Sequence, residues 1–267
     1  MKGIYGKLLS LLIVGMVMFS LSSCGKEVSV EGENKKAKLV LGTSADYAPY
    51  EFHKEIDGKD TIVGFDIDIA KAIAEDLDME LEIKDMSFDG LLEALVTGKI
   101  DIIIAGMTPT PERAENVDFS KIYYTAVNNI LINKENMDKI STLEDLKGKK
   151  IGVQKGSVQE ALVTEQIKEA EFKSLTKITD LILELKHGKV DAIVIENPVA
   201  EAYVEKNQDL MITDMKFDVN SEELGSAVAA AKGSDELIEA INKTIDKLIA
   251  EGKINEFIVE ANNLLED

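Results

Sequence analysis

The stretch ALVTGKIDIII, residues Ala94–Ile104, has a counterpart in ELKHGKVDAIV, residues Glu184–Val194. Each stretch predicts a helix that ends at a Gly-Lys pair, followed by a β-branched residue, an aspartate and an apolar strand. Apolar strands of this kind are typical of parallel sheets that helices cover on both faces. The pattern therefore predicts that the chain builds one α/β unit twice.

A second pair of segments supports this interpretation. The apolar strand predicted at Leu39–Gly42 resembles Lys150–Val153, and a polar loop and a helix follow each of them. The two pairs are separated by about 90 and about 110 residues, which exceeds the repeat length of solenoid proteins. We therefore expect two similar α/β lobes, with the ligand site in the cleft where the carboxyl ends of their strands meet.

Local signals place several elements of the first lobe. Apolar spacing predicts a helix over Phe65–Leu77, with Asp66 and Asp68 in its first turn as helix-start residues and not as metal ligands. A second helix is expected over Phe88–Thr97, and a continuous strand over Ile100–Ala105.

Composition narrows the possible partners. The chain has 267 residues, 45% of them hydrophobic, which suits one or two domains. Its formal net charge of −20 argues against nucleic acid as a partner, because phosphate binding needs clustered Lys and Arg. Neither a Ser-His-Asp pattern nor a phosphate loop or Cys-rich metal spacing occurs in the sequence, so we expect no enzyme, no metal site and no cofactor.

The N-terminus has the features of an export signal. Lysines precede an apolar run that is too short for a membrane span, which predicts a signal peptide over residues 1–23. The run ends in Leu-Ser-Ser-Cys24, similar to a bacterial lipobox, and Cys24 is the only cysteine of the chain. Residues 24–37 then read as a lipidated cysteine and a flexible tether, which would anchor the protein to the outer face of the cell membrane.

Polar loops follow the predicted strands of both lobes. Thr110 and Pro111 are expected to begin a helix with Arg113 in its first turn. A cation there opposes the helix dipole, unless its guanidinium binds an anion such as a carboxylate. On spacing alone, Arg113 is either a surface residue or such a clamp.

The second lobe offers complementary groups. Ser157 and Glu160 form a Ser-x-x-Glu pattern, which predicts a capping box at a helix whose N-terminal amides suit an anion, and Gly156 permits close approach. Glu196 ends the strand over Ala192–Ile195. An arginine, an amide-rich helix end and a carboxylate together predict a cavity for a zwitterion.

Three motifs carry a resemblance to a known family. They are GFDIDIAKAIA from Gly64, AGMTPTPER ending at Arg113, and VDFS from Val117. In this order they closely resemble the polar-amino-acid solute-binding proteins, which include histidine-, arginine- and glutamine-binding periplasmic proteins. The resemblance extends over residues 38–267.

The resemblance implies roles for individual residues. Arg113 would clamp the α-carboxylate with Thr108 and the amides near Ser157 and Val158, while Glu196 and the Gly106 carbonyl would hold the α-ammonium. Glu196 stands where the family usually has Asp. Ser44 stands where several binders of basic amino acids have Asp, which argues against lysine or arginine as the ligand unless Glu51 points inward and substitutes for that Asp. The ligand-binding residues implied in this way are Ser44, Tyr47, Glu51, Phe88, Ala105, Gly106, Thr108, Arg113, Gln154, Ser157, Val158, Gln159 and Glu196.

The resemblance also implies a fold and a function. The fold is α/β, the two-lobed type II periplasmic-binding-protein fold, with two crossover strands at the hinge. Residues 38–126 with 227–267 would form lobe 1, and residues 127–226 lobe 2. The function would be that of the extracytoplasmic substrate-binding lipoprotein of an amino acid ABC importer, a monomer that delivers a free polar amino acid to the permease and ATPase subunits.

Two other functions share this fold. One is a periplasmic dehydratase acting on an amino-acid-like substrate, which would need a general acid above a leaving group. His53 and His187 do not fall in the predicted site loops. The other is an amino acid sensor or adhesin with the same pocket.

Overall fold

The computed structural model describes residues 36–218 and 225–266. The predicted signal peptide, Cys24 and nearly all of the tether lie outside these residues. Residues 36–267 form one compact unit. Among the described residues, no helix is both long and apolar enough to span a membrane.

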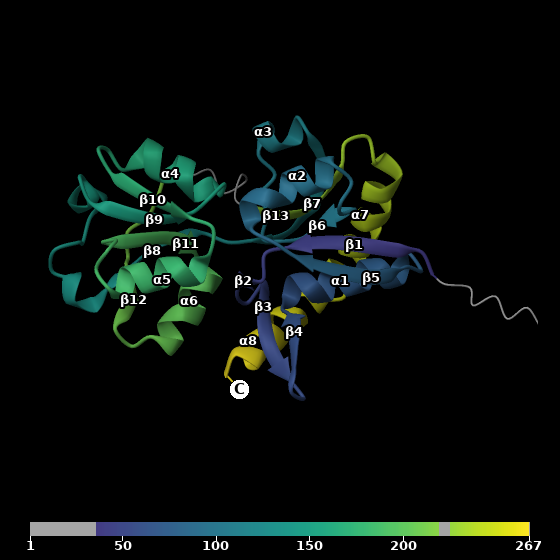
Figure 1. The fold of residues 1–267 in the computed structure, drawn as a ribbon, viewed down its shortest axis with the longest axis horizontal. Helices are drawn as coiled ribbons and strands as arrows, with labels where there is room; N and C mark the ends of the chain where they lie inside the picture. Colours follow the sequence, from purple (N-terminus) through teal and green to yellow (C-terminus); the bar gives the residue numbers. More distant parts are fainter. Residues whose placement is uncertain (1–35, 219–224, 267) are drawn as a thin grey trace, which may run out of the picture. The chain divides into compact units, whose positions relative to one another are not determined.

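The first five-stranded sheet among the described residues has the order β5-β1-β6-β13-β7 (Figure 1). Strand β1 pairs in parallel with β5 and with β6, whereas β13 runs antiparallel to β6 and β7. We refer to this sheet and the helices that pack on it as lobe 1. The strands are β1 (Lys38–Thr43), β5 (Glu80–Asp85), β6 (Ile102–Ile103), β7 (Val117–Thr125) and β13 (Gly225–Ala231).

A second five-stranded sheet has the order β10-β9-β11-β8-β12 and forms lobe 2 with its helices. Here β9 pairs in parallel with β10 and β11, and β8 runs antiparallel to β11 and β12. The two sheets thus share one arrangement of parallel and antiparallel strands, and the predicted two-lobed α/β fold is confirmed. The strands are β8 (Asn128–Asn133), β9 (Lys150–Gln154), β10 (Glu171–Leu175), β11 (Ala192–Glu196) and β12 (Leu210–Ile212).

Helices and a small hairpin sheet complete the fold (Figure 1). The helices of lobe 1 are α1 (Phe65–Asp76), α2 (Leu91–Val96), α3 (Pro111–Ala114), α7 (Asp235–Ala250) and α8 (Lys253–Glu266). Those of lobe 2 are α4 (Val158–Gln166), α5 (Ile178–Lys186) and α6 (Asn197–Lys206). A three-stranded sheet of β2 (Asp46–Tyr47), β3 (Glu51–Ile56) and β4 (Lys59–Val63) leads from β1 to α1.

Two predicted elements differ from the structure. The strand expected over Ile100–Ala105 is reduced to β6, because only Ile102 and Ile103 pair with both neighbours. The helix expected over Phe88–Thr97 divides into a 3-10 turn, η1 (Phe88–Gly90), and α2.

The repeated Gly-Lys-x-Asp motif has the same structure in both lobes. Gly98 and Gly188 follow the ends of α2 and α5 with φ of 69° and 64°, the left-handed conformation that glycine adopts without strain. Asp101 then exchanges two hydrogen bonds with Val40 of β1: its N–H donates to Val40 O, and its Oδ2 accepts from Val40 N at 2.8 Å. Asp191 exchanges the same pair with Lys150 of β9, with Oδ2 at 2.9 Å from Lys150 N.

The two aspartates should therefore contribute equally to stability. We expect Asp101→Ala and Asp191→Ala each to lower the free energy of unfolding by about 1 kcal/mol, which is less than is usual for a bond to a charged acceptor because both bonds lie at exposed sites. Denaturant unfolding of the purified protein measures this. Asp138→Ala, at an exposed site, is the control and should change stability by less than about 0.5 kcal/mol. Unchanged stability in either aspartate variant would contradict this account.

Candidate functional site

A small cavity lies where the carboxyl ends of the two sheets meet. Eleven of the thirteen residues predicted to bind ligand line it: Tyr47, Phe88, Ala105, Gly106, Thr108, Arg113, Gln154, Ser157, Val158, Gln159 and Glu196. The volume of the cavity is about 10 Å³, which is the space of roughly one water molecule. In this conformation the lobes are closed too tightly to admit an amino acid.

Arg113 contributes the positive charge. Thr110 caps α3 as predicted, accepting a hydrogen bond from Arg113 N, and this places the arginine in the first turn. The side chain is only 9% exposed, and its guanidinium lies over the ring of Phe88 with Cζ 5.4 Å from the ring centroid. Nη1 donates to Thr108 O at 2.7 Å and Nη2 to Gly156 O of lobe 2 at 2.9 Å. Burial lowers the pKa of Arg113 to about 10, so it is charged at neutral pH.

The N-terminus of α4 differs from the sequence prediction. Ser157 occupies the N-cap position, but the expected capping box does not form. The Glu160 carboxylate instead accepts from Gly156 N at 2.8 Å and from the Ser174 hydroxyl. The Ser157 hydroxyl is buried and has no hydrogen-bond partner within the described residues. It lines the cavity and is free to bind a ligand.

Glu196 contributes a carboxyl group at the end of β11. It is 7% exposed, and its Oε2 accepts a hydrogen bond from the Tyr50 hydroxyl. Burial raises the pKa of Glu196 to about 7 against the lowering effect of this bond, and the charge of Asp66 raises it further. A cationic group brought to this carboxyl would favour its ionised form.

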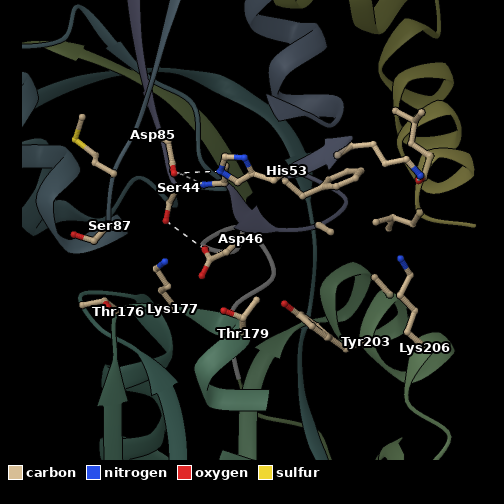
Figure 2. A pocket seen from close by; sticks show the side chains of 18 residues that line it. Ser44, Asp46, His53, Asp85, Ser87, Thr176, Lys177, Thr179, Tyr203 and Lys206 are labelled. Atoms are coloured by element: carbon tan, nitrogen blue, oxygen red, sulfur yellow. Dashed lines mark hydrogen bonds and ion pairs between the residues drawn. The ribbon is translucent and has the colours of Figure 1, made fainter. Parts of the chain in front are cut away.

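Ser44 and Glu51 are the predicted residues that do not line the small cavity. Ser44 lines a larger cavity of about 580 Å³ (Figure 2). Glu51 is 0% exposed on β3, and neither of its carboxyl oxygens has a partner among the described residues. It therefore lies behind the cavity wall and not at its surface.

The larger cavity has walls from both lobes and carries charges of both signs. Asp46, Asp85 and His53 line it from lobe 1, and Lys177 and Lys206 from lobe 2 (Figure 2). His53 Nε2 lies 3.3 Å from Asp85 Oδ2. The cavity reaches the polar loop that ends β1 through Ser44, which is hydrogen-bonded to Asp46 at 3.4 Å.

Contacts across the cleft hold the lobes in this closed arrangement. Asp46 Oδ2 accepts from Ile178 N at 2.7 Å, so an aspartate of lobe 1 supplies the cap that α5 lacks from its own N-cap residue, Lys177. Lys155 Nζ lies 2.8 Å from Asp89 Oδ2. Burial raises the pKa of Asp46 to about 6.

Sequence reasoning missed the roles of Tyr50, Asp66 and Asp46. Asp66 begins α1 as predicted, yet it is fully buried and its Oδ2 accepts from Gly106 N and from the Tyr123 hydroxyl, both at 2.8 Å. Its partners lie 40 and 57 residues away in sequence, and no local pattern identifies them. In the part of the chain that the structure describes, no group of three or more His, Cys, Asp or Glu is placed to hold a metal ion.

Comparison with known proteins places this geometry in a family. Residues 39–260 match the family model of the bacterial extracellular solute-binding proteins, family 3. The chain belongs to this family. The resemblance predicted from the three motifs is thereby confirmed.

Individual members of family 3 are similar over nearly the whole chain. The arginine-binding extracellular protein ArtP of Bacillus subtilis is 43% identical, with 93% of this chain and 94% of ArtP covered. A probable histidine-binding protein of Campylobacter jejuni is 36% identical, with 82% of each chain covered. The crystal structure of the amino acid ABC transporter substrate-binding protein AbpA of Streptococcus pneumoniae bound to L-arginine is 42% identical, with 86% of this chain and 97% of AbpA covered and a TM-score of 0.83.

Proposed function

We propose that this family 3 protein is the substrate-binding component of an amino acid ABC importer, and that it binds a polar L-α-amino acid, L-arginine first among them. The observation that carries the proposal is a buried arginine and a buried carboxyl group, from different lobes, at one cavity. The similar proteins are binding proteins and not enzymes.

Arg113 suits the α-carboxylate of such a ligand. Its guanidinium has five N–H donors. In the closed form, Nη1 and Nη2 donate to the backbone carbonyls of Thr108 and Gly156. Opening of the lobes separates Arg113 from Gly156 and leaves a planar fork that a carboxylate matches with two parallel bonds. The buried Ser157 hydroxyl, Thr108 and the amide of Val158 are the further donors that we assign to the carboxylate.

Glu196 suits the α-ammonium. A carboxyl group in a site closed to water gains its ionised form by pairing with a cation, and the Gly106 carbonyl is the neutral acceptor that we assign beside it. Tyr47 and Phe88 would pack on the side chain of the ligand. Ala105, Gln154 and Gln159 would complete the wall.

The preference for arginine rests on the similar proteins and on the larger cavity. ArtP is named for arginine, and AbpA holds L-arginine. A side chain that extends past Ser44 would enter the larger cavity, where Asp46 and Asp85 carry carboxyl groups. These two acids would take the place of the aspartate that several binders of basic amino acids have at the position of Ser44.

We further propose that residues 38–126 with 227–267 move against residues 127–226 as rigid lobes, through crossovers near residues 126–129 and 224–228. The space of one water molecule in the closed cavity supports this, since an amino acid can enter only after the lobes separate. The protein would act as a monomer, anchored outside the cell by lipid on Cys24.

Calorimetric titration with each of the twenty amino acids tests the proposed function. We expect L-arginine to bind and its α-amide and decarboxylated analogues to bind weakly, because each lacks the carboxylate that Arg113 would hold.

Arg113→Ala should weaken arginine binding by roughly 30-fold to several thousand-fold, since loss of one partner of a buried charge pair costs about 2–5 kcal/mol. Arg113→Lys should restore little, because an ammonium lacks the planar fork.

Lys121→Ala is the control, because it removes a cation that pairs with Asp246 at the surface of lobe 1, away from the cavity. Binding of a sugar or a peptide without a response to any amino acid would refute the proposed ligand class. Binding by Arg113→Ala within about threefold of the wild type would refute its role as the clamp.

Affinity should also depend on pH through Glu196. Its pKa of about 7 in the ligand-free protein means that the carboxyl group must release a proton to pair with the ammonium. Arginine affinity should therefore fall as pH falls from 8 to 5, by up to about tenfold per pH unit below 7. Calorimetry in buffers of different ionisation enthalpy measures the released proton. Glu196→Gln should bind weakly with a flatter profile, and an unchanged profile would contradict the assignment.

The lipid anchor is tested separately. Cys24→Ala should leave arginine binding by the purified protein unchanged, because the predicted tether separates the cysteine from the cavity. In the producing cell it should leave the protein unprocessed or release it from the membrane fraction. Fractionation and mass spectrometry measure both, and membrane retention of a correctly cleaved variant would contradict the proposal.

A further inference from the structure

Two fully buried carboxyl groups, those of Glu51 and Asp66, lie behind the cavity. Asp66 Oδ2 accepts hydrogen bonds from Gly106 N and from the Tyr123 hydroxyl, whereas Asp66 Oδ1 is buried and receives no hydrogen bond from a described residue. Glu51 lies close enough to Asp66 that each carboxyl group shifts the pKa of the other, both residues are 0% exposed, and neither oxygen of Glu51 receives a hydrogen bond from a described residue. Two ionised carboxylates can only accept, so they cannot bond to each other.

We propose that Glu51 and Asp66 share one proton, with Glu51 as the neutral donor and Asp66 as the anion, and that this pair positions Gly106 at the wall of the binding cavity. The arrangement gives a hydrogen-bond partner to Asp66 Oδ1 and to one of the two Glu51 oxygens, which otherwise have none among the described residues. The proton of Glu51 bonds Asp66, and the Asp66 carboxylate keeps its two donors from Gly106 and Tyr123. Asp66 is thus a positioning residue, since it acts on the ligand only through Gly106.

The electrostatic surroundings favour this assignment of the proton. Burial, then the charges of Asp66 and Asp46, raise the pKa of Glu51 far above its usual range, and Glu196 adds to this. Burial also raises the pKa of Asp66, to about 6, but its bonds from Gly106, Tyr123 and Glu51 act in the opposite direction. Of the pair, Glu51 therefore keeps its proton at neutral pH and Asp66 gives its proton up.

The position of Gly106 explains why the pair matters for binding. Gly106 has φ of 55°, the left-handed conformation, and a Cβ there would lie 3.2 Å from the Tyr47 ring. Its N–H points to Asp66 while the residue lines the cavity. Rotation of the peptide group that carries this N–H would also turn its carbonyl. The hydrogen bond that the N–H donates to the Asp66 carboxylate opposes that rotation.

The pair predicts an unusual pH dependence of stability. A carboxyl group whose pKa is higher in the folded than in the unfolded protein binds more protons when folded. Its contribution to the free energy of unfolding is therefore fully present below pH 4.5 and is lost as pH rises through its folded pKa. Glu51→Gln keeps a neutral donor and abolishes this loss. The other acids near Glu51, namely Asp46, Asp66 and Glu196, remain in the variant and cancel in the comparison.

The test uses the ligand-free protein, so that it is independent of the proposed function on which the inference about binding rests. Relative to the wild type, Glu51→Gln should melt at a temperature that rises with pH between 5 and 8, by about 2–4 °C or more in total. Asp66→Asn should speed hydrogen exchange of the Gly106 amide at least tenfold by NMR, while Glu51→Gln should leave it within about threefold. Asp68→Asn removes a neighbouring acid from the same helix turn and is the control for the helix start.

Arginine titration then measures the effect on binding, with Asp66→Asn expected to weaken affinity at least tenfold.

The inference is overturned if Glu51→Gln melts below the wild type by a margin that grows with pH, because Glu51 would then be ionised. It is also overturned if Asp66→Asn leaves Gly106 exchange unchanged. Tyr123→Phe, which removes one donor to Asp66 and keeps the ring, should speed Gly106 exchange and decides the case if Asp66→Asn does not fold. Failure of every protein to bind arginine would refute the proposed ligand and leave the exchange and melting results to decide the pair.

Discussion

The burial of charge at the carboxyl ends of the strands is the constraint on which this site depends. Taking Arg113, Glu196 and Asp66 out of water costs free energy, and each is retained only because polar partners surround it. The partners of Arg113 are backbone carbonyls, that of Glu196 is a tyrosine hydroxyl, and those of Asp66 include a backbone amide. These partners lie in the loops that follow strands: Gly106 and Thr108 after β6, Gly156 after β9, and Tyr50 after β2. This is why the strand ends carry the cavity.

Much of the fold was predictable from local pattern. The Gly-Lys-x-Asp motif predicted two α/β units because its features act within a few residues: glycine ends the helix, and the apolar run forms the strand. Strand length was not predictable in this way. Ile100–Ala105 is apolar throughout, but β6 is limited to the two residues that pair with β1 and β13, and β13 lies more than 100 residues further along the chain.

The site, like the fold, was predictable in part from local sequence. Motif resemblance predicted the residues that line the small cavity, since strand-exit loops converge by topology. It did not predict the direction of individual side chains. Glu51 lies behind the wall, where Asp66, Tyr47 and Tyr123 are its polar neighbours. The Ser157 capping box does not form because the Glu160 carboxylate accepts from Gly156 N and the Ser174 hydroxyl instead. Partners that come from elements distant in sequence leave no signal in either segment.

Because the closed cavity is too small for a ligand, affinity depends on more than the contacts that the ligand makes. A ligand that enters only the open form experiences an apparent dissociation constant divided by the open fraction, however well the site fits it. The ion pair of Lys155 and Asp89 joins the two lobes in the closed form, and neither residue lines either cavity. Such a residue sets the occupancy of the protein at a given amino acid concentration through the conformational equilibrium alone. Evolution can therefore match this protein to scarce or abundant nutrient without altering the residues that recognise it.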